Sequence, residues 1–337
     1  MPAGGSSLVS GEFAADGALS ADEQLRSGGD ALRRLAGLPR ARDDLELAAA
    51  AVAEIEQAAR VFAAAPDRRR VGFFGSSRVP PGDPLYEQAR LFAELITAEN
   101  WMVITGAGPG LMRAANAGAG IENGFGVNIA LRSAATANEF VDEARHIVHK
   151  YFFLRKLSLV RASAGFVVMP GGFGTADEAF ELLTLAQLGK MPPAPIVLLD
   201  QPGGSYWTRF VDFVQHTMVE AGYVRRDNLA LFRVTDSASV AVAELVGFHA
   251  NYQCRHWVGD RLVLHLRHQP PPAVLGELAQ RFADLAAEGI VADVGDPVDC
   301  AAAGPATLSL RVTARRFGRL RQLIDELNAT GSSTGAG

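Results

Sequence analysis

This chain of 337 residues has few cysteines, no long apolar run and no excess of positive charge. Its two cysteines, Cys254 and Cys300, lie far apart and form no C-x-x-C pair, which is typical of a reduced protein without a disulfide framework. No uncharged apolar run reaches the roughly 18 residues of a membrane span, and no signal peptide is visible. The net charge of −5 provides no basic field for a nucleic-acid polymer. We therefore expect a cytoplasmic protein that binds neither membranes nor nucleic acid.

Several signatures of cofactor and metal chemistry are also absent. The stretch TGAGPGLM at 105–112 has a G-x-G-x-G pattern, and no acidic residue ends the next apolar run, so it is not the dinucleotide fingerprint. The chain has no G-x-x-x-x-G-K-[ST] loop and no G-x-S-x-G elbow, which disfavours a P-loop NTPase and a serine hydrolase. His146 and His149 are three residues apart on an expected helix, and we interpret them as surface residues. We expect neither a metal nor a cofactor.

From residue 70 onward, short apolar runs alternate with amphipathic helical segments. This alternation predicts a parallel sheet covered by helices on both faces, a Rossmann-like doubly wound α/β fold. Glycines follow several of the runs, which places a ligand site at the carboxyl ends of the strands. The segment 142–164 is expected to be mostly helical. The expected strands are 70–75, 101–106, 125–131, 165–171, 194–200 and 231–237.

The chain divides into five predicted segments. Residues 26–69 form N-terminal helices, and residues 70–252 form the α/β nucleotide-binding domain. Residues 253–330 form a small α+β module whose β-α-β-β-α order suggests a ferredoxin-like or ACT-like fold. That module has no evident catalytic cluster and is a candidate for regulation by a small-molecule effector. The Gly-, Ala- and Ser-rich ends, 1–25 and 331–337, are expected to be disordered.

Three glycine-rich turns follow expected strands and are the candidates for phosphate binding: GSSR at 75–78, TGAGPG at 105–110 and PGGFGT at 170–175. Each precedes a helix, whose first amide groups and dipole favour an anion by roughly 0.3–1 kcal/mol. Three such turns on one sheet edge favour a mononucleotide pocket, although each turn alone is as well explained by a tight bend that needs glycine. The residues concerned are Gly75, Ser76, Gly108, Gly110, Gly171, Gly172, Gly174 and Thr175.

The third turn opens a helix that carries two acids, Asp177 and Glu178, near its start. Acids at a helix N-terminus are stabilised by the dipole, so helix stability alone explains the pair. Adjacent helix residues project about 100° apart, so only one of the two faces a ligand in the turn. Glu178 lies three residues after Thr175 and shares its face. Thr175 caps the helix, bonds a phosphate group or does both, and Glu178 is the better candidate for chemistry.

Together these motifs resemble the LONELY GUY (LOG) family, whose members are often mislabelled lysine decarboxylases. PGGFGTADE at 170–178 fits P-G-G-x-G-T-x-x-E, and RK at 155–156 lies upstream at the usual place. FFGSSR and TGAGPGLMRAAN fit the first two turns. The resemblance covers roughly residues 70–250. It implies a Rossmann-like homodimer that hydrolyses the N-glycosidic bond of nucleoside 5′-monophosphates, such as AMP or cytokinin ribotides, to a free base and ribose 5-phosphate.

The chain departs from the family pattern in one segment, and the resemblance implies roles for individual residues elsewhere. The segment GVNIALRSAATANEF at 126–140 lacks a proline and a glutamine of the family pattern, which leaves the identity of the base open. Arg78, Arg113 and Asn116, which follow the first two turns, are weaker candidates. The alternative to an enzyme is a non-catalytic carrier of a nucleotide or a pterin cofactor. The implied residues are Arg155 and Glu178 as the catalytic pair, Gly172, Gly174 and Thr175 as ligands of the 5′-phosphate, and Lys156 as a further substrate contact.

Overall fold

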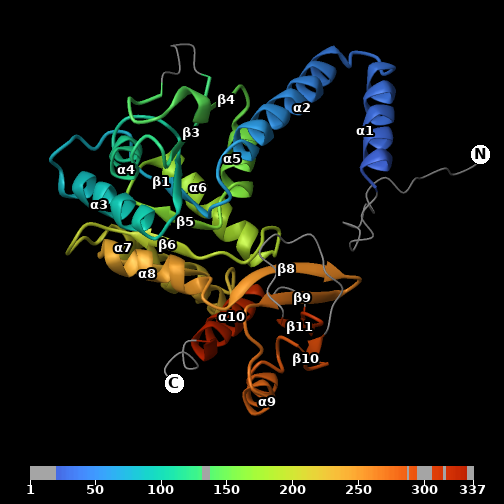
Figure 1. Cartoon of the computed structure of the whole chain (residues 1–337), viewed down its shortest axis with the longest axis vertical. Helices are drawn as coiled ribbons and strands as arrows, with labels where there is room; N and C mark the ends of the chain where they lie inside the picture. Colours follow the sequence, from blue (N-terminus) through green and yellow to red (C-terminus); the bar gives the residue numbers. More distant parts are fainter. Residues whose placement is uncertain (1–19, 131–136, 287, 294–305, 314–315, 332–337) are drawn as a thin grey trace, which may run out of the picture. The chain divides into compact units, whose positions relative to one another are not determined.

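The described part of the chain forms two compact units in the computed structural model (Figure 1). The larger unit lies within Ala49–Tyr252 and Arg315–Gly337, and the smaller one lies within Met1–Ala48 and Gln253–Ala314. No helix in the described ranges has both the length and the apolar character that crossing a membrane requires. The structure describes residues 20–130, 137–286, 288–293, 306–313 and 316–331.

The larger unit is built on a seven-stranded parallel sheet with the strand order β4-β3-β2-β1-β5-β6-β7. Buried apolar runs form most of the inner strands because both of their faces are covered, as the sequence pattern predicted. The expected Rossmann-like α/β fold is therefore confirmed. The strands are β1 (Arg70–Phe74), β2 (Met102–Thr105), β3 (Gly124–Ile129), β4 (His146–His149), β5 (Gly165–Val168), β6 (Ile196–Leu199) and β7 (Phe232–Thr235).

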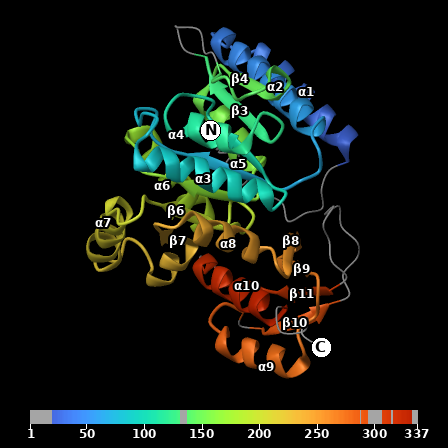
Figure 2. The same ribbon diagram turned by 60° about the vertical axis from the view of Figure 1, so that its left-hand side comes forward.

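Helices cover the sheet on both faces (Figure 2). Side chains alternate along each strand, so Val71 and Phe73 of β1 enter one core and Phe74 enters the other. Helices α3 (Pro84–Ala98), α4 (Leu111–Ala119) and α8 (Ala238–Phe248) cover the first face. On the second face lie α5 (Phe152–Arg161), α6 (Phe173–Gln187), α7 (Tyr206–Phe213) and part of α2 (Arg42–Ala63).

The order of the strands fixes where a ligand site forms. From β1 the chain winds outward through β2 and β3 to β4, and then returns to place β5 on the other side of β1. The direction of winding therefore reverses between β1 and β5. In open α/β sheets the loops at such a reversal diverge, and the crevice between them binds ligands at the carboxyl ends of the strands.

A single turn of π-helix, η2 (Val214–Val219), continues α7, and a 3₁₀ segment, η3 (Arg226–Leu231), leads into β7. The last helix, α10 (Phe317–Gly331), packs against α8 and η3 in the larger unit. Asn328 of α10 fixes this contact, because its Nδ2 donates to Phe248 O at 2.7 Å and its Oδ1 accepts from Tyr252 N at 2.8 Å.

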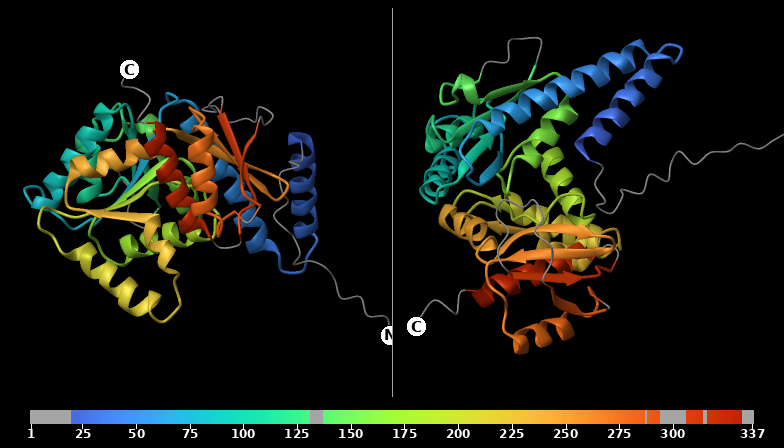
Figure 3. Two further views of the ribbon diagram at one scale, coloured as in Figure 1. Left: turned by 90° about the horizontal axis from the view of Figure 1, so that it is seen from below. Right: turned by 45° about the vertical axis from the view of Figure 1, so that its right-hand side comes forward.

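The smaller unit contains a four-stranded sheet of order β10-β11-β9-β8 (Figure 3, right). The pairings of β11 with β9 and β10 are antiparallel, which confirms the expected antiparallel sheet, whereas the helix that was expected to end the module, α10, belongs to the larger unit. Leu262 and Leu264 of β9 pair with Leu310 and Leu308 of β11, and all four are buried. The elements are β8 (Tyr252–Val258), β9 (Arg261–Leu266), α9 (Pro272–Arg281), β10 (Ile290–Asp293) and β11 (Ala306–Leu310).

Two strands were missed in the sequence. His146–His149 was assigned to a helix but forms β4, in which polar and apolar residues alternate along the edge of the sheet. The prediction that both histidines lie on the surface is wrong for His149, which is fully buried with its Nδ1 2.9 Å from Glu54 Oε2. Strand β8 was partly assigned to the helix before it, and its start at Tyr252 follows closely on α8.

The N-terminal helices are α1 (Ala21–Ala36) and α2, and α1 begins inside the stretch 1–25 that was expected to be disordered. A capping box explains this start: Ser20 Oγ accepts from Glu23 N, and the Glu23 carboxylate accepts from Ser20 N at 2.7 Å. Residues 1–19 and 332–337 lie outside the described residues. Cys254 is disulfide-bonded, contrary to the expected reduced thiol, and Cys300 lies outside the described residues.

Candidate functional site

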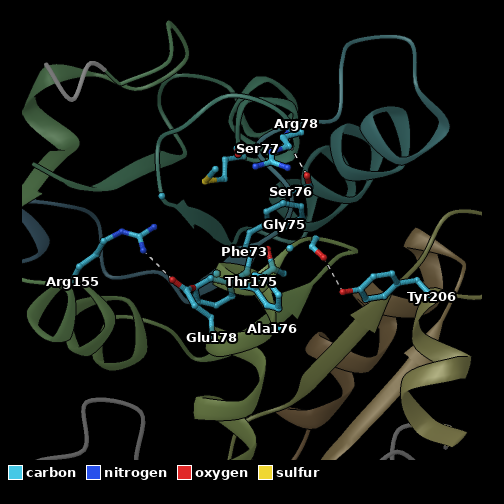
Figure 4. A pocket seen from close by; sticks show the side chains of 17 residues that line it. Phe73, Gly75, Ser76, Ser77, Arg78, Arg155, Thr175, Ala176, Glu178 and Tyr206 are labelled. Carbon is cyan, nitrogen blue, oxygen red and sulfur yellow. Dashed lines mark hydrogen bonds and ion pairs between the residues drawn. The ribbon is translucent and has the colours of Figure 1, made fainter. Parts of the chain in front are cut away.

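A cavity of about 870 Å³ lies at the carboxyl ends of β1 and β5, where the winding of the sheet reverses (Figure 4). Its wall is formed mainly by the end of β1, the turns that follow β1 and β5, and the start of α6. The turn after β2 and helices α4, α5 and α7 each contribute one residue. The lining residues are Phe73, Phe74, Gly75, Ser76, Ser77, Arg78, Gly106, Met112, Arg155, Gly171, Gly172, Phe173, Gly174, Thr175, Ala176, Glu178 and Tyr206.

The start of α6 forms one wall of the cavity. The helix begins at Phe173, and its N-cap residue, Gly172, provides no side chain to bond the first amide groups. Thr175 makes no capping bond, although it is buried against the turn. A Cβ on Gly171 would lie 2.2 Å from Thr175 Oγ1, so only glycine permits this close packing. A helix start whose amide groups have no side-chain cap is an anion site by geometry and by dipole.

Arg155 and Glu178 form an ion pair beside this helix start, with Arg155 Nη1 2.9 Å from Glu178 Oε1. Arg155 comes from α5 and Glu178 from the second turn of α6. A second bond, from Arg155 Nε to Val127 O at 3.0 Å, fixes the guanidinium group against the end of β3. The side chains are only 13% and 10% exposed, so the pair is held in a largely desolvated place.

The second carboxylate oxygen of Glu178 differs from the first. Oε2 is buried and has no hydrogen-bond partner among the described residues, although Glu178 lines the cavity. Burial raises the pKa of Glu178 to about 7, against the opposing effect of the charge and hydrogen bond of Arg155. A carboxyl group with this pKa exchanges a proton readily near neutral pH, and no described residue bonds its second oxygen.

Gly106 creates the room that Arg155 needs. It is the first glycine of the turn after β2, and a Cβ at this position would lie 2.3 Å from Arg155 Nη2. Gly106 lines the cavity, whereas the predicted Gly108 and Gly110 of the same turn do not. A Cβ on Gly108 would meet Met112 Cε at 2.7 Å.

Gly110 packs against the first turn instead of the cavity. It has a φ of 69°, and a Cβ there would lie 2.4 Å from Ser76 O. Leu111 N then donates to Ser76 O at 2.9 Å, while Ser76 N donates to Pro170 O at 3.2 Å. Ser76 thus joins all three glycine-rich turns, and Gly75 beside it also lines the cavity.

The weaker candidates have different surroundings. Asn116 is fully buried, and its Oδ1 accepts from Thr105 Oγ1 at 2.7 Å and from Asn138 Nδ2 at 3.1 Å, which holds the second turn in shape. Arg113 donates to Tyr86 Oη at 2.6 Å and lies outside the cavity lining, whereas Arg78 lines it. The segment 126–140, expected to shape the base pocket, is described only outside 131–136.

Lys156 is adjacent to Arg155 in sequence but points elsewhere. Its Nζ lies 2.6 Å from Asp177 Oδ2 and 3.0 Å from Glu181 Oε2, and it does not line the cavity. The same 100° rotation per helix residue that separates Asp177 from Glu178 separates Lys156 from Arg155. The ammonium group of Lys156, which was expected to contact substrate, therefore forms ion pairs with two carboxylates of α6.

Tyr206, the first residue of α7, was missed in the sequence. Its hydroxyl donates to Gly171 O at 2.8 Å, and its ring lines the cavity (Figure 4). A similar signal was present here as well, because Gly203 and Gly204 lie in the turn between β6 and α7. A fourth glycine turn after a strand next to β5 was therefore readable as part of the same edge.

Parts of this chain are similar to known proteins. Residues 111–245 match the family model described as "Possible lysine decarboxylase". The chain is 36% identical over 75 residues to a cytokinin riboside 5′-monophosphate phosphoribohydrolase of Rhodococcoides fascians, covering 22% of this chain and 36% of that protein. It is 35% identical over 86 residues to the phosphoribohydrolase LOG4 of Arabidopsis thaliana, covering 26% and 37%. These alignments span little more than a third of either relative.

A longer alignment is made with the probable phosphoribohydrolase LOGL9 of Oryza sativa subsp. japonica, at 29% identity over 185 residues, which cover 53% of this chain and 77% of that protein. Among solved structures, a molybdenum cofactor binding protein of Rippkaea orientalis aligns with a TM-score of 0.36 at 21% identity, over 52% of this chain and 93% of that one. The molybdenum cofactor carrier protein of Chlamydomonas reinhardtii aligns with a TM-score of 0.35 at 22% identity, over 52% and 94%. At these TM-scores the structural alignments add no argument about function.

Proposed function

We propose that this chain, whose α/β core belongs to the LONELY GUY (LOG) family, hydrolyses the N-glycosidic bond of nucleoside 5′-monophosphates. The products are a free base and ribose 5-phosphate, and AMP and cytokinin ribotides are the candidate substrates. The names of the relatives support this reaction class. We place the reaction in the cytoplasm, as the composition led us to expect.

One observation carries the proposal: a buried arginine–glutamate pair and a helix start without a side-chain cap face the same cavity. A nucleoside 5′-monophosphate has an anionic end and, one sugar away, a bond that breaks with development of positive charge on the ribose. The start of α6 fits the phosphate. The carboxylate of Glu178 fits the ribose cation, because a negative charge in a desolvated place stabilises it strongly.

The proposed step uses the two oxygens of Glu178 differently. Oε1 remains bonded to Arg155, while Oε2 stabilises the ribose cation and takes a proton from water as the water oxygen bonds to C1′. The base leaves with the electron pair of the C–N bond and takes up a proton from solvent, and Glu178 afterwards returns its proton to solvent. Arg155, fixed by Val127 and Glu178, supplies donors toward the departing base. Phosphate binding provides energy remote from the reacting bond.

The pKa of Glu178 sets the pH dependence that this step requires. Burial raises that pKa to about 7, and the step needs the ionised form. The value of kcat/KM for AMP is therefore expected to rise with pH through about 7.

We also propose that two copies of the chain associate through α5 and α6. Large apolar side chains on these helices are exposed, and Phe173 at the start of α6 is 97% exposed beside the cavity. Several exposed large apolar side chains on two successive helices are a reason to expect a protein interface there. The exposed side chains are Phe152, Phe153 and Leu157 of α5, and Phe173 and Phe180 of α6. Sedimentation of the full chain, compared with a Phe152→Ser/Leu157→Ser variant, tests this association.

The antiparallel module of the smaller unit is proposed as the site of a small effector. Deleting everything after residue 254 is a poor test, because α10 packs on α8 in the larger unit and would be lost as well. A panel of amino acids and nucleotides added to the full chain, with initial rates of base release as the readout, tests the effector role.

The test of the main proposal is incubation of the full chain with AMP and with isopentenyl-AMP, followed by chromatography of the base and of ribose 5-phosphate. Equal amounts of both products are expected. Tight nucleotide binding without either product would favour the carrier alternative. Neither binding nor product would exclude both functions.

A further inference from the structure

We propose that Tyr206 is a positioning residue for the phosphate-binding turn: its hydroxyl group holds the Gly171–Gly172 peptide so that the first amide groups of α6 face the 5′-phosphate. This inference rests on the proposed function, in which the phosphate binds at the start of α6. It assigns a role to a residue that comes from a different strand–helix connection than the turn itself.

The contact joins two neighbouring turns at the edge of the sheet (Figure 4). Tyr206 Oη donates to Gly171 O at 2.8 Å, across 35 residues of sequence. Gly171 precedes the N-cap residue Gly172, so the bond reaches the peptide that leads into the helix.

The direction of this carbonyl group matters because a peptide unit is planar and trans. When Gly171 O points toward Tyr206, the amide group of Gly172 must point the opposite way. Two consecutive glycines have many accessible backbone conformations, so this orientation is not fixed by their own geometry. A Cβ on Gly172 or Gly174 would meet nothing within 4 Å, so packing does not fix the turn at these positions either. Ser76 N holds the preceding carbonyl group, of Pro170, and Thr175 packs against Gly171. The hydrogen bond from Tyr206 is the side-chain restraint on the Gly171 carbonyl group itself.

Tyr206 is itself held firmly. The buried carboxylate of Asp200, at the end of β6, accepts from Tyr206 N at 2.8 Å and from Gln201 N at 2.9 Å. Gly204 leaves room for that carboxylate, since a Cβ there would lie 2.3 Å from Asp200 Oδ1. The neighbouring Trp207 packs edge-on against the Tyr206 ring with a centroid distance of 4.8 Å. The donor is therefore placed in advance, and little side-chain freedom is lost when a ligand binds.

The test is the variant Tyr206→Phe, which removes the hydroxyl group and keeps the ring. Tyr223→Phe is the matched control, because Tyr223 is 81% exposed and does not line the cavity. Titration calorimetry with ribose 5-phosphate and with adenine separates phosphate binding from base binding. Steady-state rates with AMP then separate KM from kcat.

We expect Tyr206→Phe to weaken ribose 5-phosphate binding and to raise KM for AMP by about 3- to 10-fold, as for the loss of one neutral hydrogen bond. Adenine affinity and kcat are expected to stay unchanged, and Tyr223→Phe is expected to behave like the unmodified chain. Unchanged ribose 5-phosphate affinity would overturn the proposal. An equal loss of adenine affinity would also overturn it, because Tyr206 would then be a general part of the cavity wall.

The outcome also separates this proposal from the proposed function. If the unmodified chain binds ribose 5-phosphate but releases no base from AMP, hydrolysis is excluded while the calorimetric comparison still decides the role of Tyr206. If it does not bind ribose 5-phosphate, both the phosphate site and the positioning role are excluded.

Discussion

Two buried arginine–glutamate pairs in the larger unit differ in what they leave free. Arg321 of α10 bonds Glu244 Oε1 of α8, and the same carboxylate bonds Arg233 Nη1 through Oε2 at 3.1 Å. Both oxygens of Glu244 are therefore occupied, and the guanidinium group of Arg321 lies 4.7 Å from the centre of the Phe248 ring. This pair fastens the last helix to the sheet unit.

The pair at the cavity is similar in residue type and in burial, but only Oε1 of Glu178 is bonded. A buried carboxylate oxygen without a partner costs free energy in the folded state. The comparison teaches that burial of an arginine–glutamate pair does not by itself indicate structure or function. The difference lies in the carboxylate. Among the described residues, Glu178 lines a cavity and leaves Oε2 without a partner, whereas both oxygens of Glu244 are bonded and the atom without a partner is Arg321 Nη1.

The largest expected effect is a difference in enzymatic activity between variants of the two glutamates, Glu178 and Glu244. Glu178→Gln is expected to lower kcat/KM for AMP by roughly 10³-fold, because the charge and the proton acceptor at the ribose are lost. Glu244→Gln, the matched control, is expected to retain that activity in its folded fraction. Initial rates of adenine release measure both. Full activity in Glu178→Gln would refute the role assigned to Glu178.

The next effect separates the two pairs by stability. Arg321→Met is expected to lower the free energy of unfolding by about 3 to 4 kcal/mol, because it leaves a buried carboxylate with a single partner. Arg233→Met removes the other partner of Glu244. Because the Arg233 side chain is 55% exposed, this change is expected to lower the free energy of unfolding by less than about 1 kcal/mol. Urea denaturation measures both values. Equal losses would show that the buried contact of Arg321 is not what holds α10.

A third effect comes from the pH dependence of stability. Burial gives Glu178 a pKa of about 7 in the folded chain, above its usual value of 4.5, so the folded state binds the proton more tightly. This stabilisation is complete below pH 4.5 and is lost as the pH rises through about 7. The free energy of unfolding of Glu178→Gln minus that of the unmodified chain is therefore expected to increase by about 3 kcal/mol between pH 4.5 and 8. A constant difference across this range would contradict the raised pKa.

The smallest effect concerns the charges around Glu178. Burial raises its pKa, the charges of Arg155 and Lys156 lower it, and the charge of Asp177 raises it. Lys156→Gln is expected to move the midpoint of the pH profile of kcat/KM upward by less than about one unit, and Asp177→Asn is expected to move it downward. Lys190→Gln is the control, because Lys190 is not among the charges that shift the pKa of Glu178. Shifts of the same sign in both test variants would exclude this electrostatic role.

Much of the fold was readable because buried parallel strands are nearly continuous apolar runs, as in Val71–Phe74 and Ile196–Leu199. The strand His146–His149 was not predicted, because its polar and apolar residues alternate and form no such run. It also lies just before a helix, α5, so the two were assigned together. The position of α10 was not readable either. Its amphipathic pattern predicts a helix, but no local pattern states which unit its apolar face will cover.

The part of the candidate site that could be predicted consists of residues that are close together in the sequence. The PGGFGT turn and Glu178 are adjacent in the chain, so their shared face followed from helix geometry. Arg155 was placed only through resemblance, since its meeting with Glu178 depends on how α5 and α6 pack. Tyr206 was missed because its partner lies 35 residues away and the contact is to a backbone carbonyl, which leaves no side-chain signature.

Gly106 gives a means of sorting relatives of this chain before any assay. Its missing side chain is the space into which the guanidinium group of Arg155 fits. A relative that keeps the arginine and the glutamate but carries a larger residue at this position has no room for that arrangement. We expect such a chain to bind nucleotides without breaking them. The residue at the position of Gly106 would then distinguish enzymes from nucleotide-binding proteins among sequences whose catalytic residues are identical.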